Sequence, residues 1–152
     1  MSYTEADARQ QMLDKLAGAT DDLARALASL TGAYELLDER QGDRLEQQLF
    51  RPVQRAYGRA RSTHAGFAAR YGFEQREFQT PIPEAPSTGI PGFVEHAVEA
   101  AGAADAAIAE LQDSLMPIEV GDAELRAGLT EVRQLLAGVP EQARAFVRVF
   151  GR

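Results

Sequence analysis

The side chains that could do chemistry in this 152-residue chain are few, because it has two histidines, four tyrosines and no cysteine. His64 falls on the apolar face of a predicted helix, where burying an unpartnered imidazole costs free energy. Thr20 is the lone polar residue on the apolar face of the preceding predicted helix, and antiparallel pairing would bring it near His64. With Tyr57 and Tyr71, these residues form a candidate polar pocket for a small ligand. The alternative, which we favour, is a core histidine with a satisfied hydrogen bond.

The remaining residues give little support for catalysis. His96 lies between Glu95 and Glu99, off the apolar face of its helix, and is expected to be solvated. No Glu-x-x-His pattern occurs, which disfavours the di-iron sites of helical bundles. The lack of cysteine excludes thiol catalysis, disulfides and cysteine-containing zinc sites, and no P-loop, dinucleotide fingerprint or nucleophile elbow is present. We therefore expect no metal, no cofactor and a non-enzymatic function.

A histidine phosphotransfer module is a further alternative, because such modules are helical bundles in which a histidine lies near cationic side chains. The arginine-rich helix around His64 and its segment STHAGFAARYG, residues 62–72, suggest this class. The lysine and glycine usual just after the phosphorylated histidine are missing, and His64 is predicted to face inward. We rank this alternative last.

Three arginines form a candidate anion-binding face. Arg51, Arg55 and Arg59 recur at four-residue steps, so they share one side of a helix. Such a face could hold an anion or a phosphorylated partner. The commoner outcome is pairing with acidic neighbours, which contributes only about 0–1 kcal/mol for each exposed pair. We favour the structural interpretation.

The net charge of −7 argues against general affinity for nucleic acid or for anionic membranes. No run of eighteen apolar residues is present, and the polar start MSYTEADARQ does not resemble a secretion signal. The absence of cysteine fits a reducing cytoplasm, and fifteen of the sixteen basic residues are arginine, which hints at a GC-rich bacterial genome. We expect a soluble, cytoplasmic, bacterial protein without nucleic-acid or membrane partners.

Four apolar seams predict an all-α fold, because apolar residues recur in steps of three and four. The seams run over residues 13–37, 45–71, 94–115 and 125–150. Thr4 with Asp7, or Ser2 with Glu5, is expected to cap the first helix, and Gly42 to end it, with Asp43 capping the second. Gly121 and Asp122 are expected to open the fourth helix.

Three prolines mark expected irregularities in the helices. Pro52 lies where the second seam takes steps of four, which predicts a kink near residues 48–52. Pro117 is expected to end the third helix. Pro140 lies inside the fourth seam without shifting its phase, which predicts one bent helix instead of two.

A proline-rich segment separates the two halves of the chain. Residues 79–93, QTPIPEAPSTGIPGF, contain four of the seven prolines, which favour extended geometry. We predict that residues 79–90 join two helical hairpins, about 3–77 and 91–150, within a single domain 1–152. Twelve extended residues reach roughly 37 Å, whereas a thirty-residue helix is about 45 Å long. We therefore expect up-down-up-down order, with a peptide ligand for a partner as the alternative role of the segment.

Two hairpins can bury their seams by packing together, which predicts an antiparallel four-helix bundle. Ala97, Ala101 and Ala104 on the third seam favour close helix packing or, alternatively, an apolar cleft beside Pro140. The regular seams also suit association between protomers. We therefore expect a non-enzymatic interaction or scaffold protein that forms a homo-oligomer or binds a protein partner. A bundle that binds a small molecule or an anion is the main alternative.

Overall fold

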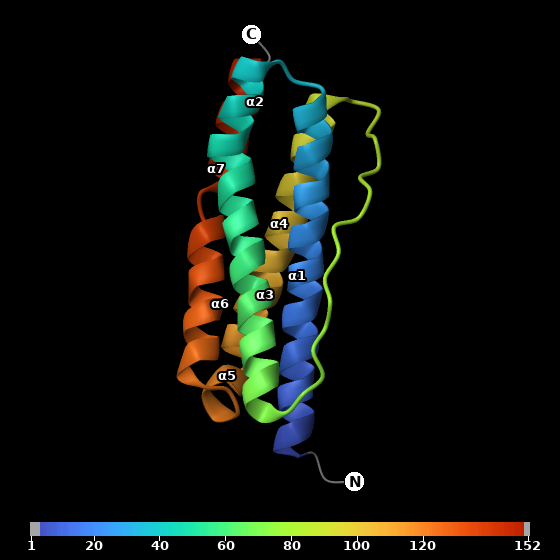
Figure 1. The fold of residues 1–152 in the computed structure, drawn as a ribbon. Coiled ribbons are helices and arrows are strands. Elements are labelled where there is room, and N and C mark those ends of the chain that lie inside the picture. The colour runs from blue at the N-terminus through green and yellow to red at the C-terminus, as the bar shows by residue number, and fades with distance from the viewer. Residues whose placement is uncertain (1–3, 151–152) are drawn as a thin grey trace.

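The computed structural model describes residues 4–150, which form α-helices joined by turns and one long extended segment (Figure 1). The fold is 80% helical, and no strand occurs among the described residues, which confirms the all-α prediction. In chain order the elements are α1 (Glu5–Glu35), α2 (Glu39–Leu45), the π-helical turn η1 (Glu46–Phe50), α3 (Arg51–Tyr71), α4 (Ile90–Asp113), α5 (Met116–Glu119), α6 (Ala123–Leu136) and α7 (Val139–Phe150).

The helices lie side by side along one axis (Figure 1). One column is α1, a second is α2 with η1 and α3, a third is α4, and the last is α6 with α7. The largest interfaces join α1 to α4 and α3 to α6, and both pairs are antiparallel. Each of these interfaces therefore connects the first half of the chain to the second.

Residues 73–89, here called the strap, run back along α1 from the end of α3 to the far end of the molecule, where α4 begins (Figure 1). The expected up-down-up-down order is therefore wrong, since α3 and α4 run in the same direction. Gly72 adopts the left-handed conformation, with φ 75°, and ends α3, so the extended segment starts well before residue 79. About seventeen residues reach roughly 53 Å, whereas the 24 residues of α4 span about 36 Å.

The capping residues fix where several helices begin. The Thr4 hydroxyl accepts the Asp7 N–H, and the Asp7 carboxylate accepts the Thr4 N–H, which confirms Thr4 with Asp7 as a capping box. The alternative cap, Ser2, lies outside the described residues. Asp122 caps α6 as predicted, because its carboxylate accepts the Leu125 N–H at 2.8 Å. Pro117 does not end the third helix, because α4 already ends at Asp113 and this proline lies in the first turn of α5.

The turn between the first two helices lies earlier than predicted. The carboxylate of Asp38 accepts the Gln41 N–H at 2.8 Å and starts α2 at Glu39. Gly42 lies inside α2, buried against the ring of Tyr34, and Asp43 is not a cap. An aspartate four residues upstream of the glycine therefore decides the boundary.

A π-helical turn takes the place of the kink predicted before Pro52. Proline has no N–H, and its ring crowds the carbonyl four residues back, so a widened turn relieves both problems. The Arg51 N–H bonds instead to the carbonyl of Glu46, five residues earlier. The extra residue in this turn accounts for the steps of four in the seam, and it keeps Leu49 and Val53 buried.

The last column is interrupted, so the prediction of one bent helix is wrong. α6 ends at Leu136 and α7 begins at Val139. Pro140 lacks the N–H that would bond to the carbonyl of Leu136, and Gly138 lies in the break. The seam nevertheless keeps its phase, because Leu136, Val139 and Ala143 are all buried.

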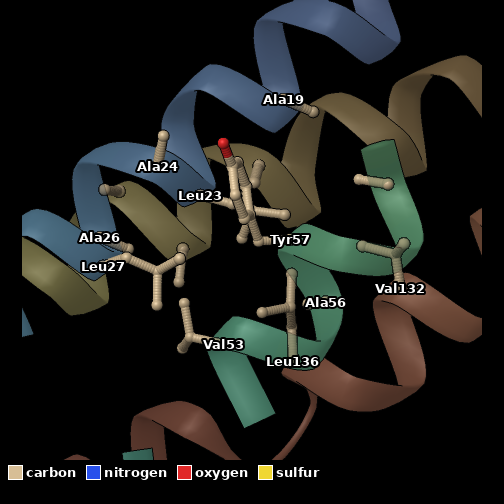
Figure 2. Packing of buried hydrophobic residues seen from close by; sticks show 14 of the residues in the cluster. Ala19, Leu23, Ala24, Ala26, Leu27, Val53, Ala56, Tyr57, Val132 and Leu136 are labelled. Carbon is tan, nitrogen blue, oxygen red and sulfur yellow. The ribbon is translucent and has the colours of Figure 1, made fainter. Parts of the chain in front are cut away.

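The core lies between the helical columns. In Figure 2, Val53 and Tyr57 of α3 face Leu23 and Leu27 of α1, and Leu136 of α6 closes the same layer. The predicted seams supply most of the buried residues, with Tyr34 and Leu115 as exposed exceptions. Within residues 4–150, no helix has the length and apolar character needed to cross a bilayer.

Candidate functional site

His64 lies on α3 beneath the first half of the strap. Its side chain is 3% exposed, and its ring meets the ring of Phe78 edge-on, with the centroids 5.4 Å apart. The Nδ1 atom is buried without a hydrogen-bond partner. Burial lowers the pKa of His64, and the charge of Arg76 lowers it further, while Asp14 of α1 opposes them. The site therefore favours a neutral imidazole.

The first half of the strap is tied to both neighbouring helices. Arg76 donates to the carbonyl of Ala17 and pairs with Asp21 at 2.8 Å, so it holds the strap against α1. Gln75 donates to the carbonyl of Ala65 on α3 at 3.1 Å. The Arg76 guanidinium also lies 4.8 Å from the ring centroid of Phe78. These contacts close the strap over His64.

The other residues of the predicted polar pocket each have a local partner. Thr20 is fully buried, and its hydroxyl donates to the carbonyl four residues earlier at 2.8 Å. Arg61 lies 5.3 Å from the ring of buried Tyr57, and Arg9 lies 4.3 Å from the ring of half-buried Tyr71. The polar pocket stays a prediction, and its one support is the unpartnered imidazole nitrogen.

The arginine face divides into two parts. Arg59 pairs with Glu131 at 2.6 Å and so links α3 to α6. Arg51 and Arg55 are exposed and make no ion pair within residues 4–150. Arg59 thus behaves as the structural interpretation expects, and an anion site at the other two arginines stays a prediction.

A shallow apolar groove of about 470 Å³ lies between α4 and α7, and we call it the α4–α7 groove. The apolar residues lining it are Pro91, Val94 and Val98 from α4, and Pro140, Ala143 and Val147 from α7. Glu95 lies on the α4 wall, and Arg144 and Arg148 lie on the α7 wall. The groove therefore combines an apolar floor with opposite charges on its two sides.

The groove borders buried seam residues of both α4 and α7. The seam alanines Ala97, Ala101 and Ala104 are buried, as are Val139 and Phe146. The largest interface of α4 is nevertheless with α1, so close packing of these alanines against the last column stays a prediction. The groove itself is lined by the seam residues Val94 and Ala143, by off-seam Val98 and Val147, and by the prolines in the first turns of both helices.

The charged side chains at the groove are unpaired in the described part of the chain, whereas several charged side chains between other helices form ion pairs. Arg70 pairs with Asp122 at 2.7 Å, and Arg133 pairs with Asp105 at 3.0 Å. Glu95, Arg144 and Arg148 form no ion pair within the described part of the chain. Both walls of the groove therefore carry charge that remains available to a partner.

Comparison of the chain with protein-family models, with curated proteins and with solved structures finds no match. The functional conclusion therefore depends on the geometry of the chain.

Proposed function

We propose that the protein is a non-enzymatic interaction protein, built as a four-helix bundle of two hairpins, that self-associates through the α4–α7 groove. The observation that supports this function is the apolar floor bordered by unpaired opposite charges. Apolar surface supplies affinity for many partners, whereas a fixed charge arrangement selects among them. A second copy of this chain carries the matching arrangement.

The symmetry of such a dimer follows from the direction of the helices. α4 and α7 are antiparallel neighbours, and the same groove holds Glu95, Arg144 and Arg148. A two-fold axis parallel to the helices places α4 of one protomer over α7 of the other. Each Glu95 then faces the partner's pair of arginines, and the two apolar floors close on each other.

The charge distribution disfavours the other pairing of the same surfaces. Residues 91–119, which include all of α4 except Ile90, hold six acidic residues and no basic one. A dimer that laid α4 on α4 would oppose like charges, which is unfavourable when they are brought close. The parallel two-fold arrangement is therefore the one that this surface supports.

Sedimentation equilibrium of the full chain tests the proposal, and we expect a reversible dimer at micromolar concentrations. Val147→Glu places a carboxylate on the apolar floor and should weaken the dimer at least tenfold, because burying an unpaired charge is costly. Ile118→Glu is the matched control, since Ile118 is 65% exposed on α5, away from the groove. A wild-type monomer at high micromolar concentration would overturn self-association.

Charge exchange tests the predicted orientation. Glu95→Arg alone, or Arg144→Glu with Arg148→Glu, should each weaken the dimer roughly tenfold, or about 1.4 kcal/mol. The triple variant restores opposite charges across the two-fold axis and should recover most of the lost affinity. Failure of the triple variant to recover, with intact helical content, would contradict the proposed pairing.

A further inference from the structure

A second cavity lies under the strap, on a different face from the α4–α7 groove. Its volume is about 460 Å³, within the range of small-molecule sites. The residues that line it are Arg25, Ala28 and Ser29 from α1, Pro81, Ile82, Pro83 and Glu84 from the strap, and His96, Glu99 and Ala100 from α4. Figure 1 shows the strap bowing outward from α1 in its second half. We call this space the strap cavity.

One wall of the strap cavity carries a hydroxyl group without a partner in the described chain. Ser29 is 9% exposed and makes no hydrogen bond through its side chain among residues 4–150. Thr20, Thr31 and Thr63 behave differently, because each hydroxyl donates to the carbonyl four residues earlier in its helix. The buried side-chain atoms without a partner in the described chain belong to Gln48 and His64, so the Ser29 oxygen is reachable from the cavity and free to bond to a ligand there.

Two unpaired carboxylates border the same cavity. Glu84 of the strap and Glu99 of α4 form no ion pair in the described chain, and His96 lies one helical turn from Glu99. The one cation lining the cavity, Arg25, is already paired with Asp22. The uncompensated charge at the cavity is therefore negative.

The rest of the lining is apolar. Ala28 and Ala100 are buried and form part of the wall between α1 and α4, while Pro81 and Pro83 of the strap also line the cavity and Ile82 between them is 93% exposed. Within residues 4–150, no group of three or more His, Cys, Asp or Glu side chains is placed to hold a metal ion. The chemistry thus suits an organic cation better than an inorganic one.

We propose that the strap cavity binds a small organic ammonium ion, with its charged nitrogen between Glu84 and Glu99 and its hydrocarbon part against the alanines and prolines. The ammonium donates hydrogen bonds to the two carboxylates and to the Ser29 hydroxyl oxygen. The prolines supply a rigid apolar cover with little conformational entropy left to lose on binding.

The strap can admit such a ligand without disturbing the helices. Its first half is held by Gln75 and Arg76, whereas the backbone of residues 79–88 makes no hydrogen bond to a helix among the described bonds. The Gly89 N–H bonds to the Pro86 carbonyl at 3.3 Å, which stays within the strap. The cover over the cavity can therefore shift as a unit without breaking a backbone hydrogen bond to a helix.

A titration of the ¹⁵N-labelled full chain, followed by NMR at fixed ionic strength, tests this site. The probes are cyclohexylammonium, uncharged cyclohexanol and anionic cyclohexanecarboxylate, which share one ring and differ in charge. We expect cyclohexylammonium to shift the amide signals of Ser29, Ile82, Glu84 and residues 96–100, and to bind at least tenfold more tightly than the other two. Equal binding of cyclohexanol, or shifts spread over other acidic surfaces, would overturn the proposal.

Variants distinguish binding at the strap cavity from a general attraction of cations to an acidic protein. Glu84→Gln and Glu99→Gln should each weaken cyclohexylammonium binding roughly three- to tenfold, and Ser29→Ala should weaken it to a smaller degree. Glu77→Gln removes an exposed carboxylate from the strap outside the cavity and should leave binding unchanged. An equal loss for Glu77→Gln, or no loss for the two cavity carboxylates, would contradict the site.

Discussion

At the scale of single residues, His64 is the clearest case in which a position singled out in the sequence has an unusual environment in the fold. An imidazole on the apolar seam of a helix is covered by Phe78 and lies near Arg76, and one of its nitrogens has no partner. The neighbouring positive charge and the burial both oppose protonation. Because Phe78 and Arg76 belong to the strap, the closed strap helps to keep the buried His64 ring neutral.

This burial predicts a pH dependence of stability. Because the pKa of His64 is lowered in the folded state, the unfolded chain binds more protons below about pH 6.5. The free energy of unfolding should therefore be fully retained above pH 6.5 and fall as the pH drops toward the lowered value. Urea unfolding followed by circular dichroism between pH 8 and pH 5 measures the effect.

Two variants assign this pH dependence to His64. His64→Gln should flatten the profile in this range, whatever its effect on absolute stability, because the titrating group is gone. His96→Gln removes an exposed histidine and should leave the slope unchanged. A profile that keeps its slope in His64→Gln would assign the effect elsewhere.

At the scale of elements, the contact between α3 and α6 depends on a glycine. A Cβ atom at Gly128 would lie 2.7 Å from the Cγ2 atom of Thr63, closer than carbon atoms approach without strain. Thr63 cannot easily turn away, because its hydroxyl donates to the Arg59 carbonyl at 2.7 Å. The helices therefore approach closely only because position 128 lacks a side chain.

Gly128→Ala should lower the free energy of unfolding by about 1–3 kcal/mol, as overpacking does in a closed interface. Gly18→Ala is the matched substitution, since Gly18 is an exposed helical residue with open space around the new methyl group. It should stabilise the protein by about 0.5–1 kcal/mol through helix propensity. Chemical denaturation of both variants provides the comparison, and a neutral Gly128→Ala would show that the interface can relax.

The sequence predicts the helical seams well, because apolar residues that recur every three or four positions share the one face of a helix that must be buried. Helix ends are predicted less well because several capping residues compete locally. Asp38 prevails over Gly42 as the boundary signal, and Gly72 ends α3 where we expected the hairpin to continue to about residue 77. This last boundary reverses the topology, because it lengthens the strap enough to cross the molecule.

The candidate site was harder to predict than the fold. The α4–α7 groove depends on which helices are neighbours, and no residue pattern within one helix contains that information. Glu95, Arg144 and Arg148 are ordinary surface charges in the sequence, and only their common position at one groove gives them significance. Ser29 likewise differs from a helical threonine only through the cavity beside it.

At the scale of the whole molecule, the halves of the chain are held together by more than the strap. The main interfaces, α1 with α4 and α3 with α6, each join residues before the strap to residues after it. Cutting the strap should therefore leave the fold intact, whereas a chain of two separately packed hairpins would come apart.

A glutamate-specific protease tests this arrangement. We expect first cleavage after Glu84, because it is exposed in the half of the strap without backbone bonds to helices. The fragments 1–84 and 85–152 should elute together from a sizing column and keep the helical circular dichroism of the intact chain. Separation of the fragments in native buffer, or first cleavage at Glu74 or Glu77, would contradict this prediction.

The crossing of the strap also has a consequence for synthesis on the ribosome. α1 is made first, yet its main partner α4 ends at Asp113, roughly 80 residues later. At ordinary translation speeds this interval lasts roughly 4–16 s, during which the leucine-rich side of α1 has only α3 to cover it. Part of the apolar face of α1 must therefore stay exposed to solvent until most of the protein has left the exit tunnel.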